Sequence, residues 1–277
     1  MSTTNTRPRM LAAAMLAAVG FGVLACAADD GVSPTDERVR VSLGAMYVSS
    51  STNVQVDSSA GVPGTNINAE SEFGLERTDF EPEFQAMVRV ETRHRLSFDY
   101  FTLDRSGNAT VGASPIDFGD VKFEPGEPLQ TQLNLRTLGV TYGYSFWHSE
   151  WLELAGTFGV RATDISSTAK VETQTEHIIQ NEDHAGPLPM AGIDATWVAS
   201  SRFYFDGRAQ YLSAHLHDIS GSLGIYELDA LYRYRPNVSF ALGYTDVSAH
   251  LSSTHTSQAG FFDFATQGPE MFFRVAF

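Results

Sequence analysis

The stretch MFFRVAF at residues 271–277 decides the fold. Successive side chains of a strand point to opposite faces, so the apolar residues at 271, 273, 275 and 277 share one face and Arg274 lies on the other. Chain termini are usually polar and frayed, and a soluble domain rarely ends on a bare aromatic strand. The stretch therefore predicts a strand with one strongly apolar face, and the rest of the chain repeats this design.

The beginning of the chain has the pattern of an export signal. Arg7 and Arg9 precede an apolar run over residues 10–25, and acidic, polar sequence follows from Asp29. The run is too short to span a membrane comfortably, so we expect a cleaved signal peptide at residues 1–27, cut after Ala27. The alternative is an imperfect lipobox, VLAC at 23–26, in which Cys26 would be lipidated. Because Cys26 is the only cysteine, no internal disulfide can form.

Composition limits the classes of partner. The 277 residues carry a formal net charge of −15, which disfavours nucleic acid. Charged residues are sparse for a soluble protein at 18%, whereas aromatic residues are plentiful at 12%. Lys122 and Lys170 are the only lysines, and the remaining basic residues are arginines, which pair well with carboxylates in a confined space.

Period-two alternation recurs along the chain, and helical periodicity is nearly absent. It predicts ten strands, with eight as the alternative, in one domain over residues 39–277. The segment 28–38 would precede the first strand. Long polar loops alternate with tight turns between the strands. The expected strands are residues 40–56, 80–90, 96–109, 130–146, 151–171, 188–198, 203–215, 222–234, 238–250 and the segment after 269.

The two faces of these strands differ in character. One face is apolar and compatible with lipid, as in Leu138, Val140 and Tyr142. The opposite face is small or charged, and charges in a narrow lumen must pair because an unpaired buried charge costs several kcal/mol. A water-soluble barrel would be inverted, and a soluble β-sandwich with one polar face is the rival interpretation. We therefore predict an all-β, antiparallel, up-and-down transmembrane barrel with interlocked lumen charges: Arg40, Arg89, Asp99, Glu153, Arg161, Asp194, Asp206, Arg208, Glu227, Asp229, Arg233 and Arg274.

Aromatic residues gather beside the predicted tight turns. Amphipathic rings prefer the membrane–water interface, and transmembrane barrels carry aromatic girdles there. Any one ring could belong to a core, but the shared depth favours a girdle. Its expected members are Tyr142, Tyr144, Phe146, Trp147, Trp151, Trp197, Phe203, Tyr232, Tyr234, Phe240 and Phe277.

Several motifs resemble one family. They are RVSLGA at 40–45, RHRLSFD at 93–99, LGVTYGYSF at 138–146, PLPMAG at 187–192 and ALGY at 241–244. With them the chain resembles the small outer-membrane β-barrel proteins of proteobacteria, in particular a largely uncharacterised group. The likeness covers nearly the whole predicted mature chain. It implies an outer-membrane location in a Gram-negative bacterium, with short turns on the periplasmic side, and it supplies no catalytic residues.

The sequence gives little indication of a catalytic or metal-binding site. His215, His217 and Asp218 lie at a predicted extracellular strand end, where two histidines on one face could serve a metal or acid–base chemistry. Solvated loop histidines are the simpler interpretation. Acidic loop groups such as Glu70 and Asp117 could bind Ca²⁺, but no calcium-loop spacing is present. We therefore predict no catalytic residues, no metal and no cofactor.

Three functions stay open. The first is non-enzymatic: a narrow porin-like channel, or a structural barrel with a charged lumen. The second is a surface enzyme acting on lipid or peptide, and the third is an adhesion or ligand-binding barrel that uses its long loops. The expected partners are outer-membrane lipid, lipopolysaccharide and the barrel-assembly machinery, which would read the strand ending in Phe277.

Overall fold

The chain folds into one closed β-barrel. The computed structural model describes residues 32–171, 177–216, 218–254 and 259–277. Ten antiparallel strands form the wall, and β1 pairs with both β3 and β13, which closes the ring. The wall strands are β1 (Val39–Val56), β3 (Thr78–Glu91), β4 (His94–Thr110), β7 (Pro128–His148), β8 (Leu152–Val171), β9 (His177–Val198), β10 (Phe203–Leu216), β11 (Ile219–Arg235), β12 (Val238–Ser253) and β13 (Gly260–Ala276).

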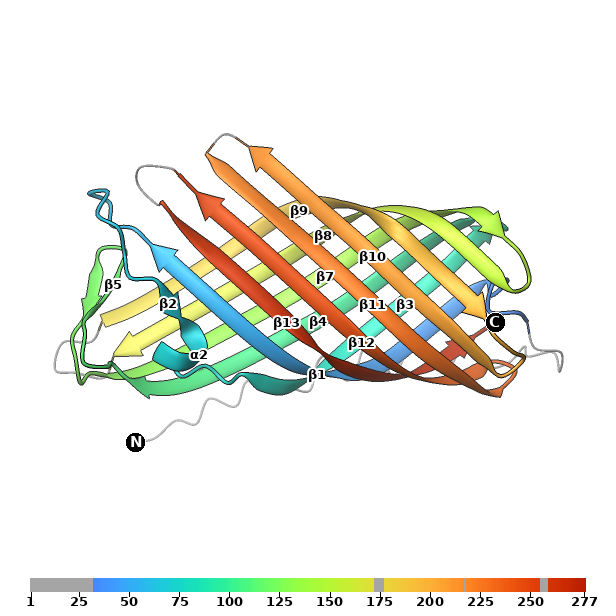
Figure 1. Cartoon of the computed structure of the whole chain (residues 1–277), viewed down its shortest axis with the longest axis horizontal. Coiled ribbons are helices and arrows are strands. Elements are labelled where there is room, and N and C mark those ends of the chain that lie inside the picture. The colour runs from blue at the N-terminus through green and yellow to red at the C-terminus, as the bar shows by residue number, and fades with distance from the viewer. Residues whose placement is uncertain (1–31, 172–176, 217, 255–258) are drawn as a thin grey trace, which may run out of the picture.

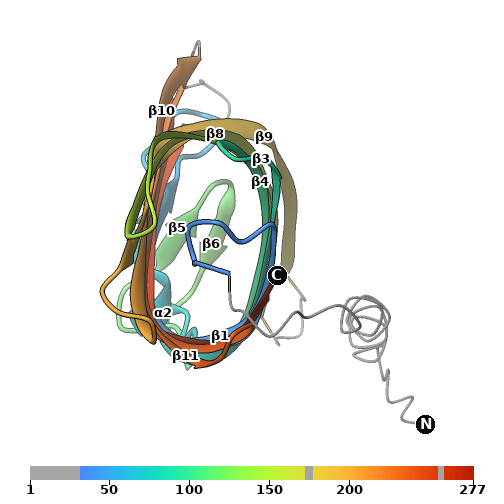
Figure 2. The same ribbon diagram turned by 90° about the vertical axis from the view of Figure 1, so that its right-hand side faces the viewer.

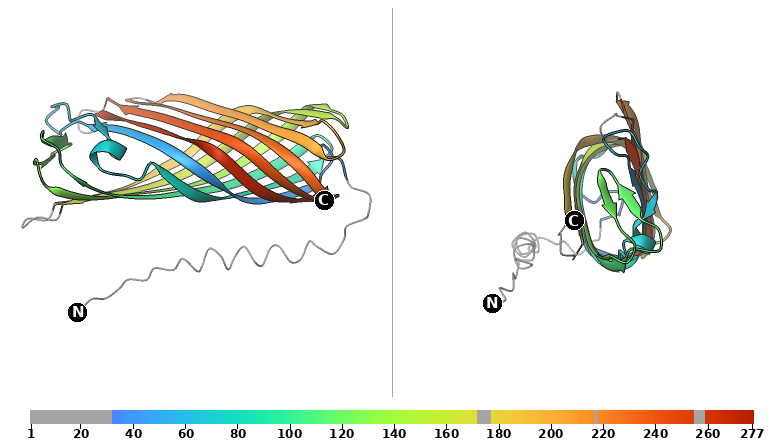
Figure 3. Two further views of the ribbon diagram at one scale, coloured as in Figure 1. Left: turned by 60° about the horizontal axis from the view of Figure 1, so that its bottom comes forward. Right: turned by 90° about the vertical axis from the view of Figure 1, so that its left-hand side faces the viewer.

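The strands run obliquely along an elongated molecule (Figure 1), and the left view of Figure 3 shows the same tilt from another side. Viewed from one end, the wall is a flattened ring (Figure 2). One end carries the short turns and residue Phe277, and we name it the turn end. The other end carries β5, α2 and the longer connections, and we name it the loop end. The expectation of a ten-stranded antiparallel barrel is confirmed, and the eight-stranded alternative is wrong.

Several strands extend further than the sequence indicated. β9 begins at His177 rather than near residue 188, and β13 begins at Gly260 rather than after residue 269. Residues 93–95 were expected in a turn, yet β4 begins at His94. The expectation ended strands where the outward apolar alternation stopped. Strand pairing continues past that level, because backbone hydrogen bonds form whichever side chains point outward.

Two predicted loops carry structure of their own. The connection after β1 contains β2 (Ile67–Asn68) and the short helix α2 (Ala69–Glu72), whose N-terminal backbone is capped by Asn68. The connection after β4 contains the hairpin of β5 (Ile116–Phe118) and β6 (Val121–Phe123). No helix in the described residues is long and apolar enough to cross a membrane.

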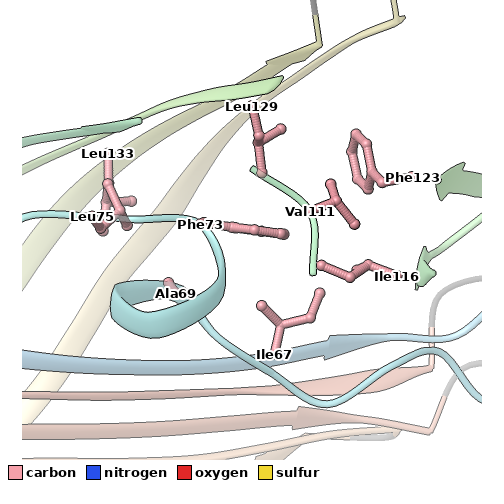
Figure 4. Packing of buried hydrophobic residues seen from close by; sticks show 9 residues of the cluster. All are labelled: Ile67, Ala69, Phe73, Leu75, Val111, Ile116, Phe123, Leu129 and Leu133. Carbon is pink, nitrogen blue, oxygen red and sulfur yellow. The ribbon is translucent and has the colours of Figure 1, made fainter. Parts of the chain in front are cut away.

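These two connections pack together as an apolar cluster at the loop end, which we name the loop cluster. Its side chains come from both connections and from β7, and they point toward one another (Figure 4). Arg105 ties the connection to the wall through Glu70, at 2.6 Å between Nη2 and Oε1. The loop cluster consists of Ile67, Ala69, Phe73, Leu75, Val111, Ile116, Phe123, Leu129 and Leu133.

Along β7, the two faces of the wall exchange character. Near the turn end, its outward residues are apolar or aromatic, from Leu138 to Phe146, and its inward residues are small, from Gly139 to Ser145. Near the loop end, the outward residues are polar, from Gln130 to Arg136, whereas Leu133 and Leu135 point inward and are buried. The barrel is therefore lipid-compatible around its turn half and water-compatible around its loop half.

Candidate functional site: the filled lumen

Charged side chains meet inside the turn half because alternate residues of each strand point inward. On β4 the inward row contains Arg95, Ser97 and Asp99, all buried, and the outward row contains exposed Leu96 and Phe98. The same alternation applies on the other strands. The result is a layer of ion pairs across the lumen, which we name the lumen lattice.

Glu153 lies at the centre of one chain of ion pairs. Its side chain has no exposed surface. The Arg89 guanidinium donates to both of its oxygens, at 2.8 and 2.9 Å, and Arg95 lies 3.3 Å from it. The Ser145 hydroxyl donates a further hydrogen bond to Glu153. A buried carboxylate with this many donors is well compensated for its loss of water.

The chain of ion pairs continues across the barrel. Arg95 also pairs with Asp194, at 3.0 Å between Nη2 and Oδ2. Arg208 lies 3.5 Å from Asp194 and 3.2 Å from Glu227. Positive and negative groups therefore alternate from β3 to β11, so each charge has an opposite neighbour.

A second group of pairs lies around Asp206. It accepts hydrogen bonds from Arg274 and from the Thr196 hydroxyl, the latter at 2.8 Å. Arg40 lies 3.4 Å from the same carboxylate. Apart from this group, Arg161 pairs with Asp99 at 2.6 Å.

Two of the ion-pair partners predicted from the sequence differ in the structure. Asp229 was expected to pair with an arginine. In the described residues it forms no salt bridge, and its Oδ1 has no hydrogen-bond partner. Its neighbour across the strands is another acid, Asp206, because β10 and β11 place both on one row. In the described residues, the one ion pair of Arg233 is a long contact with Glu37 at 3.9 Å, and its guanidinium also lies 5.7 Å from the centre of the Tyr204 ring.

Some lattice residues were missed from the sequence. Arg95 was assigned to a turn, and Glu270 lay at the start of the expected last strand but was not named in the lattice, although both point inward and are buried. The alternation of Arg95 with Ser97 and Asp99, and of Glu270 with Phe272 and Arg274, was the available signal. Glu37 could not have been found this way, because it precedes the first strand.

Glu37 belongs to a segment, residues 33–38, that crosses the opening at the turn end (Figure 2). We name this segment the strap. Glu37 accepts from Arg40 at 2.9 Å, and its backbone carbonyl accepts from Arg89 at 3.2 Å. Thr35 and Glu37 are buried. Asp36 at the rim lies 3.0 Å from His148. The strap therefore occupies the turn end of the lumen.

Above the lattice, apolar side chains fill part of the lumen, beside the buried Glu81. Inward residues of four strands pack together there, and we name this group the apolar layer: Met46, Val48, Leu103, Leu135 and Phe264. The cavity left within the lattice is about 50 Å³, which holds only a few water molecules. The expected lumen charges lie in the turn half, although Glu81 and the Arg105–Glu70 pair are also buried nearer the loop end.

The predicted girdle residues lie near the turn end on the outer surface. Tyr142, Tyr144, Phe146, Trp147, Trp151, Trp197, Phe203, Tyr234 and Phe240 are exposed there, and Tyr232 and Phe277 are half-buried. Neighbouring rings touch across strands, including Phe203 with Tyr232 at 5.1 Å and Tyr234 with Phe240 at 6.2 Å between ring centroids. Such a band of rings matches a membrane–water interface.

The remaining sequence candidates are only partly described by the structure. His215 and Asp218 are exposed near the loop end, and His217 lies outside the described residues. In the parts of the chain that the structure describes, no group of three or more His, Cys, Asp or Glu side chains is arranged to hold a metal ion. The expected signal peptide and Cys26 also lie outside those parts.

No protein-family model and no curated protein matches the sequence. Among solved structures, the outer-membrane protease OmpT from Escherichia coli matches with a TM-score of 0.55 and 10% identity, over 90% of this chain and 100% of that one. The P. putida toluene transporter TodX gives a TM-score of 0.37 and 7% identity, over 87% and 90%. The transport unit of the autotransporter AIDA-I from Escherichia coli gives 0.40 and 8%, over 83% and 89%.

At this identity the likeness to OmpT concerns the fold and does not extend to its protease activity. The match covers 90% of this chain, and so includes most of its closed ring of ten antiparallel strands. A barrel with an apolar outer band and a polar interior is stable only where lipid surrounds it. This chain therefore has the fold of a ten-stranded outer-membrane β-barrel protein, with an outer band that suits a lipid bilayer.

Proposed function

We propose that this chain is a non-enzymatic structural barrel whose lumen does not conduct solutes. The supporting observation is that side chains occupy the lumen at four successive levels: the strap, the lumen lattice, the apolar layer and the loop cluster. A barrel of about this strand number is narrow enough for side chains to fill. Of the two forms of the first function predicted from the sequence, a channel and a structural barrel, we therefore propose the structural barrel.

The apolar layer argues most strongly against ion flow. A hydrated ion can pass a polar constriction, whereas a short apolar constriction excludes water and stops conduction. Met46, Leu103 and Phe264 form such a constriction, and they are buried against one another. The acids of the lattice would favour cations only if this layer opened.

Single-channel recording of the refolded barrel in a planar bilayer tests this proposal. We expect no discrete conductance steps from the wild type. A double variant, Met46→Ser with Phe264→Ser, makes the apolar layer polar, and it should conduct more than a matched outward pair, Tyr47→Ser with Met271→Ser. Discrete wild-type steps whose ion selectivity changes in Asp229→Asn would overturn the proposal and make this chain a channel.

A second candidate function is ligand binding at the loop end. The loop half projects a polar outer wall, and its two long connections are held in place by the loop cluster and by Arg105. Ordered loops lose less conformational entropy on binding than mobile ones. Deleting the β5–β6 hairpin should abolish adhesion to a cell surface, without loss of the folded barrel, if this function holds.

The enzymatic alternative has less support. It would require chemistry from His215, His217 and Asp218, of which the two described residues are exposed. Loss of a lipid- or peptide-hydrolysing activity in His217→Ala would establish it against our proposal. The partners we propose are the lipid and lipopolysaccharide around the apolar band, and the barrel-assembly machinery, which would bind β13.

A further inference from the structure

In the described part of the chain, two buried carboxyl groups of the lumen form no salt bridge, and they lie side by side. The strand register places Asp229 of β11, Gly243 of β12 and Glu270 of β13 on one row. Asp229 is 4% exposed and Glu270 is 2% exposed. Both point into the lumen, as do their strand neighbours in the lattice.

Gly243 has no side chain, and this leaves room for the two carboxyl groups between β11 and β13. A Cβ atom at this position would collide with Asp229 Oδ1 and would lie 2.9 Å from Glu270 Oε1. Both carboxyl groups therefore lean over the glycine toward each other. The two side chains interact electrostatically, and Glu83 of β3 also interacts with Glu270.

The pair has few donors to stabilise negative charge. The Thr245 hydroxyl donates to Glu270 Oε1 at 2.8 Å. Asp229 Oδ1 and Glu270 Oε2 have no hydrogen-bond partner. In the described part of the chain, neither residue forms a salt bridge, although six other carboxylates in and around the lattice do: Glu37, Asp99, Glu153, Asp194, Asp206 and Glu227.

Most of the charged groups that face the pair are acids, and they further disfavour two negative charges on it. Glu83 faces it from β3, Asp206 from β10, Glu227 from β11 and Arg274 from β13. Arg274 is engaged by Asp206 and by the Ser42 hydroxyl. The nearest residues of β1 and β12 carry no charge. Two ionised carboxylates in contact would therefore repel each other strongly in this buried setting.

We propose that Asp229 and Glu270 form a proton-binding site, in which the two carboxyl groups share one proton at neutral pH and are joined by an acid–carboxylate hydrogen bond. The proton supplies the missing donor between two acceptors, and it removes one negative charge from a lumen in which acids outnumber arginines. Two carboxyl groups that share a site commonly hold one proton between them. This inference holds whether or not the lumen conducts.

A pH dependence of stability follows. The folded barrel would bind one more proton than the unfolded chain, whose carboxyl groups ionise near pH 4. Stability then falls as pH rises above about 4, because the unfolded state binds fewer protons. The folding equilibrium constant should fall about tenfold per pH unit for one proton, until the folded site also loses its proton.

Neutral amide variants test this site. Asn and Gln have the shape of the protonated acid, so Asp229→Asn and Glu270→Gln should each fold. Each should also reduce, by about one, the number of extra protons that the folded state binds, which is the slope of stability against pH. Urea unfolding of the refolded barrel in lipid vesicles at several pH values measures this slope. The matched control is Asp206→Asn, which leaves Arg40 and Arg274 without their carboxylate and should destabilise the barrel without removing this slope.

Infrared spectroscopy of the folded protein provides a second measurement that does not depend on unfolding. The wild type should show a protonated carboxyl band at neutral pH, and Asp229→Asn or Glu270→Gln should remove it. If the band is absent, or if neither variant changes the slope, the proposal fails. If Na⁺, K⁺ or Ca²⁺ stabilises the wild type but not Asp229→Asn, a metal cation occupies the site and the proton is excluded.

Discussion

The turn half and the loop half of this barrel place their apolar residues on opposite faces of the same strands. On β7, Leu138 and Tyr142 face outward near the turn end, whereas Gln132 and Arg136 occupy the equivalent outward positions near the loop end. Inside, Arg95 and Glu153 fill the turn half, whereas Leu103 and Leu135 fill the loop half.

The surrounding solvent explains the difference. Lipid surrounds the turn half, so apolar side chains cover it and polar groups must pair inside, where they have no water. Water surrounds the loop half, so that half folds like a soluble protein, with an apolar core and a polar surface. One strand can lie partly in lipid and partly in water. Its side chains alternate between the two faces along its whole length, but the apolar residues face outward in the turn half and inward in the loop half.

Breaking the centre of the lumen lattice should have the largest effect. Glu153→Ala leaves Arg89 and Arg95 buried without their shared carboxylate, and removal of one partner of a buried pair costs about 3–5 kcal/mol. Urea unfolding in lipid vesicles measures this loss. The exposed Glu91→Ala, at the end of β3, is the control. An equal effect of the two substitutions would mean that the lattice adds no stability.

The apolar layer should respond to the loss of volume rather than charge. Leu103 is fully buried, so Leu103→Ala should cost about 2–5 kcal/mol through lost burial and the cavity left behind. Leu43→Ala on the outward face of the turn half is the comparison, and it should cost less because lipid chains fill the space. A reversed order would contradict the assignment of solvents to the two halves.

An arginine placed along the outer face of β7 should locate the boundary between the halves. Val140→Arg puts a charge into the apolar band and should cost about 2–4 kcal/mol near the membrane midplane. Gln132→Arg lies in the polar part and should change stability by less than about 0.5 kcal/mol. The same unfolding assay checks both, and a uniform cost along the strand would remove the proposed boundary.

The smallest effect should come from an ion pair outside the lumen. Lys122 and Glu124 lie 3.2 Å apart in the connection after β4, with side chains 52% and 59% exposed. Exposed pairs contribute about 0–1 kcal/mol, so Lys122→Ala should be nearly neutral. Comparison with Glu153→Ala then shows that burial, rather than the number of ion pairs, determines their importance. A loss similar to that of Glu153→Ala would refute this view.

Prediction from the sequence succeeded where the outward residues are apolar, because there the alternation of apolar and polar residues is easy to recognise. In the turn half, period-two alternation with aromatic outward residues placed the strands and assigned Arg89, Glu153 and Arg208 to the inward face. It was less accurate for the loop half, where β9 and β13 were made too short. There the outward residues are polar, so a strand of the barrel resembles a loop in composition.

By itself, the sequence determined the fold class and the inward face of most lumen charges, because side-chain direction depends on position along a strand. It left the strand number open between ten and eight. Only the tertiary structure decided which charges meet. Arg95 reaches Glu153 and Asp194 on distant segments, the strap brings Glu37 into the lumen, and Asp229 lies against Glu270 over Gly243. These contacts depend on the register and curvature of a closed sheet, which one strand does not specify.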